Sequence, residues 1–97
     1  FGSRVKLAME DAAEESSRLI AQKARSIAPR RTGRLRDSIR PSGFMIEVRV
    51  PYAAHVEFGT RRMEAQPFLR PAISENIGKV RNIFRTKIED ELRSGLR

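Results

Sequence analysis

The feature that most constrains the fold is a stripe of apolar residues near the C-terminal end of the chain. These residues recur at steps of four, three, four, four and four positions: Ile73, Ile77, Val80, Phe84, Ile88 and Leu92. Such spacing places side chains on one face of an α-helix. Pro71 suits the first helical position, and Arg93 and Gly95 are typical of a helix end. We therefore predict a helix over residues 71–94 whose stripe faces the core.

A second amphipathic helix is predicted over residues 4–28. Apolar and small residues recur there at three- and four-residue steps: Val5, Met9, Ala12, Leu19, Ile20, Ala24 and Ile27. Acidic residues lie in its first half, and Lys23 and Arg25 lie near its end, an order that complements the helix dipole. Pro29 disfavours helical geometry at Ala28, so the helix is expected to end there.

The segment between the two helices predicts an antiparallel β-hairpin over residues 34–51. Its second arm alternates apolar residues with other side chains: Phe44, Ile46, Val48 and Val50 are separated by Met45, Glu47 and Arg49. This period of two is typical of a strand with one buried face. A weaker alternation of Leu35, Asp37 and Ile39 leaves two interpretations for the first arm, a strand or a helical turn. Pro41, Ser42 and Gly43 favour a turn between the arms.

The remaining segment predicts a short connecting helix and an extended stretch. Residues 52–59 fit a helix with Tyr52, Val56 and Phe58 turned inward, and residues 60–70 fit a loop that ends in an extended segment. Pro67 and Pro71 fix φ on either side of residues 68–70, which suits that segment to presenting apolar side chains to a groove. With 97 residues, we expect one α+β domain over residues 1–97.

The composition excludes several classes of chemistry. The chain has no Cys and one His, so it offers no disulfide, thiolate nucleophile, sulfur-based zinc site or multi-His metal site. His55 and Glu57 are two positions apart and point to different sides of a helix, so they are not a local acid/base pair. No apolar run approaches the length of a membrane span. We expect no enzyme, no cofactor and no membrane association, in a soluble, cytoplasmic setting.

The positive charge is concentrated in one stretch. The net charge is +8, and residues 30–40, RRTGRLRDSIR, hold five Arg and one Asp. Arg favours bidentate contacts to carboxylate or phosphate, so we expect acidic partners, either nucleic acid or neighbouring subunits. Gly33 is free to adopt positive φ in this loop. The candidate basic residues are Arg30, Arg31, Arg34 and Arg36.

Three ordered sequence blocks resemble a known family. The stretch from Ala28 to Ile39, the block PYAAHVEFGT and the block AQPFLRPA resemble the tailed-bacteriophage neck and tail-component family of head-to-tail joining, tail-completion and minor tail proteins. The matching positions are Arg31, Thr32, Gly33, Leu35, Ser38, Ile39, Tyr52, Ala53, Val56, Glu57, Phe58, Gly59, Thr60, Gln66, Pro67, Phe68, Leu69, Arg70 and Pro71.

The resemblance implies a structural protein of a phage or prophage virion. Such a protein assembles as a ring, commonly of six subunits, at the head-to-tail junction or tail terminus, against connector, adaptor or tail-tube proteins. It implies assembly in the bacterial host cytoplasm, no catalysis, and folding and ring contacts as the work of the matching residues. The alternative is a small DNA-binding domain whose basic loop contacts the phosphate backbone. The two hypotheses can coexist, because DNA passes through a neck ring.

Overall fold

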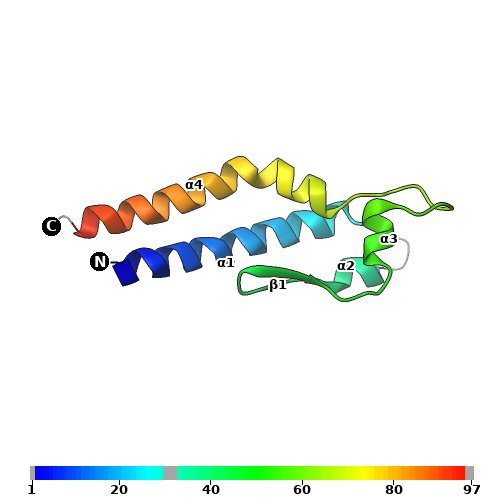
Figure 1. Cartoon of the computed structure of the whole chain (residues 1–97), viewed down its shortest axis with the longest axis horizontal. Helices are drawn as coiled ribbons and strands as arrows, with labels where there is room; N and C mark the ends of the chain where they lie inside the picture. The colour runs from blue at the N-terminus through cyan, green and yellow to red at the C-terminus, as the bar shows by residue number, and fades with distance from the viewer. Residues whose placement is uncertain (1, 30–32, 96–97) are drawn as a thin grey trace.

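The computed structural model describes residues 2–29 and 33–95 and confirms the predicted α+β fold (Figure 1). Two long helices, α1 (Gly2–Ile27) and α4 (Leu69–Gly95), run antiparallel along the molecule. Between them in sequence lie α2 (Arg34–Ser38), β1 (Ile39–Ser42), β2 (Met45–Val48) and α3 (Ala53–Phe58). The shape is elongated, with extents of 60 × 21 × 19 Å, and the start of α1 and the end of α4 lie at the same end.

The two strands form an antiparallel hairpin that lies against the second half of α1. Ile39 pairs with Val48 at the base, and Ser42 pairs with Met45 next to the turn. Two side chains of α1 fix the hairpin: Ser17 Oγ donates to the Gly43 carbonyl at 3.0 Å, and Arg25 Nη1 donates to the Ile39 carbonyl at 2.8 Å. The sheet position is therefore set at both ends of β1.

The core occupies only one end of the molecule. It contains small side chains of α1 and larger ones from the elements that pack on them: Ala21, Ala24, Ala28, Leu35, Ile39, Val50, Phe68 and Ala72. The small residues let the other elements approach the backbone of α1 closely. Phe68 and Ile39 are the largest fully buried side chains in the described chain. At the other end, α1 and α4 form a two-helix arm without a third layer (Figure 1).

The first arm of the predicted hairpin is partly wrong, because residues 34–38 are helical. Gly33 lies at φ 73°, as its sequence context allowed, and its carbonyl accepts from the Asp37 N–H at 2.9 Å. Ser38 Oγ also donates a hydrogen bond to the Leu35 carbonyl. These local contacts favour a single helical turn, and the strand begins only at Ile39. Leu35 and Ile39 are both buried. The alternating sequence pattern therefore identified two core residues correctly, although Leu35 lies on α2 and Ile39 on β1.

The predicted inward faces need three corrections. Phe44 is 57% exposed and Phe58 is 67% exposed, whereas Ile46, Val48, Tyr52 and Val56 pack against the core as expected. Met9 of the first helix is also exposed. Phe44 lies at the hairpin turn, beyond the elements that could cover it. Phe58 is the last residue of α3, and it is Tyr52 and Val56 that pack against the core.

The stripe on α4 does not face the core along its length. The buried positions of α4 are Ala72 and Asn76, which point toward α1, and Ile73 and Ile77 beside them are 46% and 49% exposed. Leu92 is exposed too, and Val80, Phe84 and Ile88 are half-buried. Over most of its length α4 packs against α1 alone. The apolar stripe therefore lies beside the α1–α4 interface, where its side chains are only partly covered.

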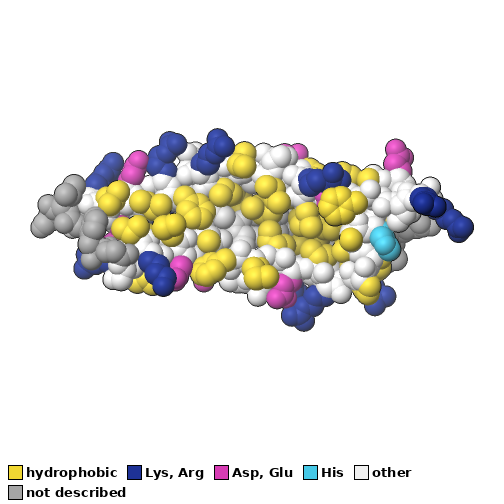
Figure 2. Space-filling view, viewed as in Figure 1, with side chains coloured by type: hydrophobic (Ala, Val, Ile, Leu, Met, Phe, Trp, Pro, Cys, Tyr) yellow, Lys and Arg dark blue, Asp and Glu magenta, His cyan; other side chains and the backbone are white. Residues whose placement is uncertain are grey.

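A band of hydrophobic side chains extends along one face of the molecule. Figure 2 shows it running along much of the length of α1 and α4, with most of the Lys, Arg, Asp and Glu side chains at its edges and beyond its ends. None of the helices described in residues 2–29 and 33–95 is long and apolar enough to cross a membrane.

Candidate functional site

The residues of the second and third sequence blocks meet at the start of α4, where the Glu57 carboxylate caps the helix. Its Oε1 accepts from the N–H groups of Phe68 at 3.0 Å and Leu69 at 2.8 Å, and its Oε2 accepts from the N–H of Arg70 at 3.2 Å. The first N–H groups of a helix have no partner within the helix, and a negative charge there also complements the helix dipole. Glu57 thus supplies from α3 the cap that α4 lacks locally.

Arg70 locks the same carboxylate from the other side. Its Nε donates to Glu57 Oε2 at 2.8 Å, and its Nη2 donates to the Glu57 carbonyl at 2.7 Å. The guanidinium also lies over the Phe58 ring, 5.1 Å from the centroid, as in a cation–π contact. One arginine therefore ties together the end of α3 and the start of α4, by contacts that a lysine could not reproduce.

The Glu57 side chain is only 4% exposed, and Glu57 is the one charged residue buried in the described chain. Burial acts to raise the pKa of its carboxyl, but the Arg70 side chain and the N–H groups of Leu69, Phe68 and Arg70 outweigh burial and hold the pKa below its ordinary value. The group is therefore a carboxylate at neutral pH with all its acceptor capacity in use. It is positioned to hold structure and has no geometry for proton transfer to a substrate.

A tight turn joins the two blocks and brings Gln66 back to α3. Gly59 has φ 77°, and a Cβ there would lie 2.8 Å from the Ala65 nitrogen. Thr60 Oγ1 accepts from the N–H groups of Arg62 and Met63, and the Thr60 N–H donates to the Met63 carbonyl. The Gln66 N–H then donates to the Val56 carbonyl at 2.8 Å. Gly59 and Thr60 are thus needed for the chain reversal itself.

The remaining positions of the blocks are structural in the same way. Phe68 is fully buried and Leu69 packs against the core. The sequence had predicted that this segment presents apolar side chains to a groove, and here they pack into the core of the chain itself. Leu35 is buried and Tyr52 packs beside it in the same cluster. Pro67 is exposed, and Pro71 is the third residue of α4, where its missing N–H costs no helical hydrogen bond. The helix begins two residues before the predicted start because Glu57 accepts those first N–H groups.

The basic loop is only partly described. Arg30, Arg31 and Thr32 lie outside the described residues, and Arg34 and Arg36 fall in α2. Arg34 is exposed and Arg36 is half-buried. Two positions on a helix are separated by about 200°, so these two guanidinium groups leave opposite sides of α2 and do not share one face. A flat anion-binding surface does not follow from this pair alone.

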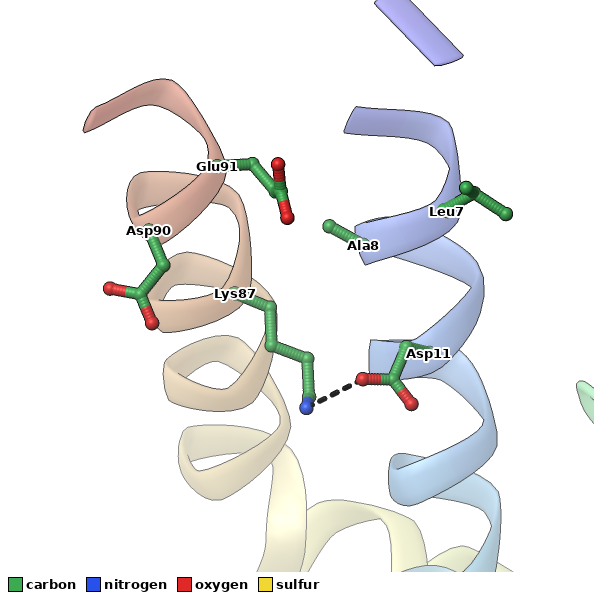
Figure 3. A pocket seen from close by; sticks show the side chains of 6 residues that line it. All are labelled: Leu7, Ala8, Asp11, Lys87, Asp90 and Glu91. Atoms are coloured by element: carbon green, nitrogen blue, oxygen red, sulfur yellow. Dashed lines mark hydrogen bonds and ion pairs between the residues drawn. The ribbon is translucent and has the colours of Figure 1, made fainter. Parts of the chain in front are cut away.

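A smaller polar cluster joins the two-helix arm. Figure 3 shows Lys87 reaching from α4 to Asp11 on α1. Lys87 Nζ lies 2.8 Å from Asp11 Oδ2 and 3.2 Å from Glu15 Oε2. The hydrogen bond with Lys87 lowers the pKa of Asp11, and the same contact with Asp11 raises the pKa of Lys87. Asp11 and Glu15 thus have a partner within the chain.

The described residues hold no arrangement typical of an active site. No group of three or more His, Cys, Asp or Glu among them is placed to bind a metal ion, and none of their buried side-chain polar atoms lacks a hydrogen-bond partner. His55 is exposed on α3. The capping role of Glu57 was missed from the sequence, because its partners begin eleven positions away and no local spacing marks such a cap.

A scan against protein-family models, a search of curated proteins and a search of solved structures found no match to this chain. Membership of the phage neck and tail-component family therefore stays a prediction that rests on the three sequence blocks.

Proposed function

We propose that this chain is a structural subunit of a ring at the head-to-tail junction or tail terminus of a tailed phage or prophage. The observation that carries the proposal is the hydrophobic band along one face of a narrow, 60 Å long molecule (Figure 2). Large apolar patches on soluble proteins mark interaction surfaces. A face of 60 × 21 Å also offers on the order of the 800 Å² that each partner buries in a standard interface.

The geometry of the sequence blocks supports the same proposal. The residues that resemble the family are engaged in capping α4, turning the chain and filling the core. This is the pattern of a protein whose shared residues maintain a shape, whereas an enzyme would direct several polar groups into an open cleft. The proposed neighbours are further copies, commonly six to a ring, and the connector, adaptor or tail-tube proteins that the ring meets in the virion.

The first experiment is negative-stain electron microscopy of the protein across concentration, paired with mass by light scattering. Closed rings are the expected result. Charge reversal at Arg34 and Arg36 is expected to reduce ring formation more than it lowers the unfolding midpoint of the monomer, because Arg34 is exposed and Arg36 only half-buried. Normal ring formation by that variant would remove these two residues from the contact.

DNA binding supplies the outcome that would overturn the proposal. A chain that stays monomeric at every concentration and binds duplex DNA, with log affinity falling against log salt at a slope of about −4 to −5, would be a phosphate-binding domain. The slope follows from neutralising about five phosphates, the number of Arg residues between positions 30 and 40. Weak DNA contact by an assembled ring is compatible with the proposal, since DNA passes through it.

A further inference from the structure

The outer side of α4 carries two exposed arginines, Arg81 and Arg85. Arg81 lies nine positions after Ala72, and Arg85 lies nine positions after Asn76. Nine positions are about two and a half helical turns, and Ala72 and Asn76 are the buried residues of α4 that point toward α1. Both arginines therefore leave α4 on the side opposite α1. Figure 2 shows Lys and Arg side chains projecting beyond the α4 edge of the molecule.

The positive charge of this pair is not compensated by the described residues. Within residues 2–29 and 33–95, neither guanidinium makes a hydrogen bond or an ion pair. The acidic residues of α4 before and after the pair have other partners, because Glu75 pairs with Lys23 and Glu89 lies 4.0 Å from Arg93. Two like charges one turn apart also repel each other. The pair is therefore suited to an anion from outside the chain.

The exposed positions next to the pair have short side chains or none. They step along α4 by four residues, and they are Ser74, Gly78 and Asn82. Short neighbours leave the long arginine side chains standing above the helix surface. Ser and Asn side chains also donate hydrogen bonds, and such donors accompany Arg in contacts to a nucleic-acid backbone. We call Arg81, Arg85 and these three residues the α4 ridge.

The spacing of the two arginines matches a phosphate backbone. Four positions along a helix correspond to about 6 Å. Phosphates on one strand of duplex DNA follow each other at about 3.4 Å along the axis, so two steps cover about 7 Å. Both guanidinium groups can thus reach phosphates of the same strand. Each guanidinium also matches phosphate oxygens in a bidentate geometry.

A second copy of the chain is a poorer match for this charge than DNA. Each copy has a net charge of +8, so it brings an excess of positive charge of its own. Of its twelve acidic residues, six already pair with cations within the chain: Asp11, Glu15, Glu47, Glu57, Glu75 and Glu89. A phosphate backbone presents a continuous row of negative charge instead.

We propose that the α4 ridge binds the phosphate backbone of duplex DNA without reading its sequence, with Arg81 and Arg85 as the two main contacts. The inference rests on the proposed function for its setting, because it names the surface that a ring subunit turns toward the DNA passing through. The ridge borders the hydrophobic band and is not part of it, so one subunit can use the band for its neighbours and the ridge for DNA. It is also separate from the basic loop, whose described arginines leave opposite sides of α2.

The test is fluorescence anisotropy of a labelled DNA duplex of mixed sequence, titrated with the full chain at several salt concentrations. Arg81→Gln/Arg85→Gln removes two charges at exposed positions and keeps good helix formers, so the fold should be retained. Affinity at low salt should fall roughly tenfold or more, and the slope of log affinity against log salt should become shallower by about two. An unaltered chain that does not bind DNA at low salt, or a variant with unchanged affinity, overturns the inference.

Arg61→Gln/Arg62→Gln is the matched control. These two arginines are exposed in the turn between α3 and α4, and the double substitution changes the net charge by the same amount. This variant should keep the salt slope of the unaltered chain. Equal losses for the two double variants would mean that DNA responds to net charge alone, which overturns the ridge as a binding surface. A polyglutamate peptide that competes as well as DNA at equal charge would assign the ridge to an acidic protein and overturn the inference too.

Electron microscopy of the same variants separates this inference from the proposed function. Arg81→Gln/Arg85→Gln should form the same assemblies as the unaltered chain while it loses affinity for DNA. A variant that loses rings but keeps its DNA affinity would make the ridge a subunit contact and overturn the inference, with the proposed function left standing. If the unaltered chain forms no rings and the variant still loses affinity for DNA, the proposed function fails and the ridge stands.

Discussion

The two ends of this molecule are held together by different kinds of charge interaction. At the core end, Glu57 is buried and makes five hydrogen bonds, four through its carboxylate and one through its carbonyl, and these join α3 to α4. At the arm end, Lys87 joins α4 to Asp11 and Glu15 through exposed ion pairs. Only the first contact involves the sequence blocks that resemble the phage family. The comparison indicates that the blocks supply the residues of one buried joint, whereas the arm is joined by more exposed ion pairs.

The largest expected effect is that of Glu57→Gln. The amide keeps the shape of the side chain but loses the charge and places an NH₂ group where backbone N–H groups now donate. Leaving such buried donors without acceptors should lower the free energy of unfolding by about 2–3 kcal/mol, measured by urea denaturation.

Glu47→Gln is the matched control for this substitution. Glu47 pairs with Arg49 on the surface of the hairpin, with the Arg49 side chain 80% exposed. Exposed pairs contribute roughly 0–1 kcal/mol, so this variant should unfold close to the unaltered chain. Equal losses for the two variants would remove the distinction between the buried cap and a surface pair.

The next largest effect is expected for Gly59→Ala. Positive φ is strained for any residue with a Cβ, and here that Cβ would also meet the Ala65 backbone nitrogen at 2.8 Å. We expect a loss of about 2 kcal/mol in the free energy of unfolding. Gly43→Ala shares the positive φ but meets no atom within 4 Å, so its loss should be about 1 kcal/mol. A reversed order would contradict the close approach at Gly59.

The sequence predicted the elements better than it predicted what covers them. The periods of residues 4–28 and 71–94 identified both long helices, because period reports which residues share a face. It does not report whether another element packs on that face, and so Ile73 and Ile77 are exposed. Likewise Gly33 indicated a turn, but the helical turn after it depends on the bond from Asp37 to the Gly33 carbonyl. The Glu57 cap depends on tertiary packing and left no local pattern.

Acid should weaken the core-end joint through Glu57. The pKa of this carboxyl is lowered in the folded chain, so the charge on Glu57 contributes stability that is complete above the unfolded value near 4.5. The contribution declines as pH falls below that value and is lost once pH passes below the folded pKa. The change should be smaller than that of Glu57→Gln, because the hydroxyl of a protonated carboxyl carries one proton and can still accept a hydrogen bond, whereas the amide NH₂ of Gln carries two protons and accepts none. Urea midpoints between pH 7 and pH 3 should fall more steeply for the unaltered chain than for Glu57→Gln, and parallel curves would contradict this assignment.

The smallest effect is expected for Lys87→Met at the arm end. The side chain of Lys87 is 29% exposed and that of Asp11 is 60% exposed, so water and salt screen their attraction. Met keeps the apolar stem that packs between α1 and α4, so the unfolding midpoint should change less than for Glu57→Gln or Gly59→Ala. The response of the midpoint to salt should become smaller, because salt no longer screens this contact, while the other ion pairs of the chain still respond. If Lys87→Met unfolded as readily as Glu57→Gln, the exposed ion pairs of the arm would contribute as much stability as the buried Glu57 cap, and the contrast between the two ends would fail.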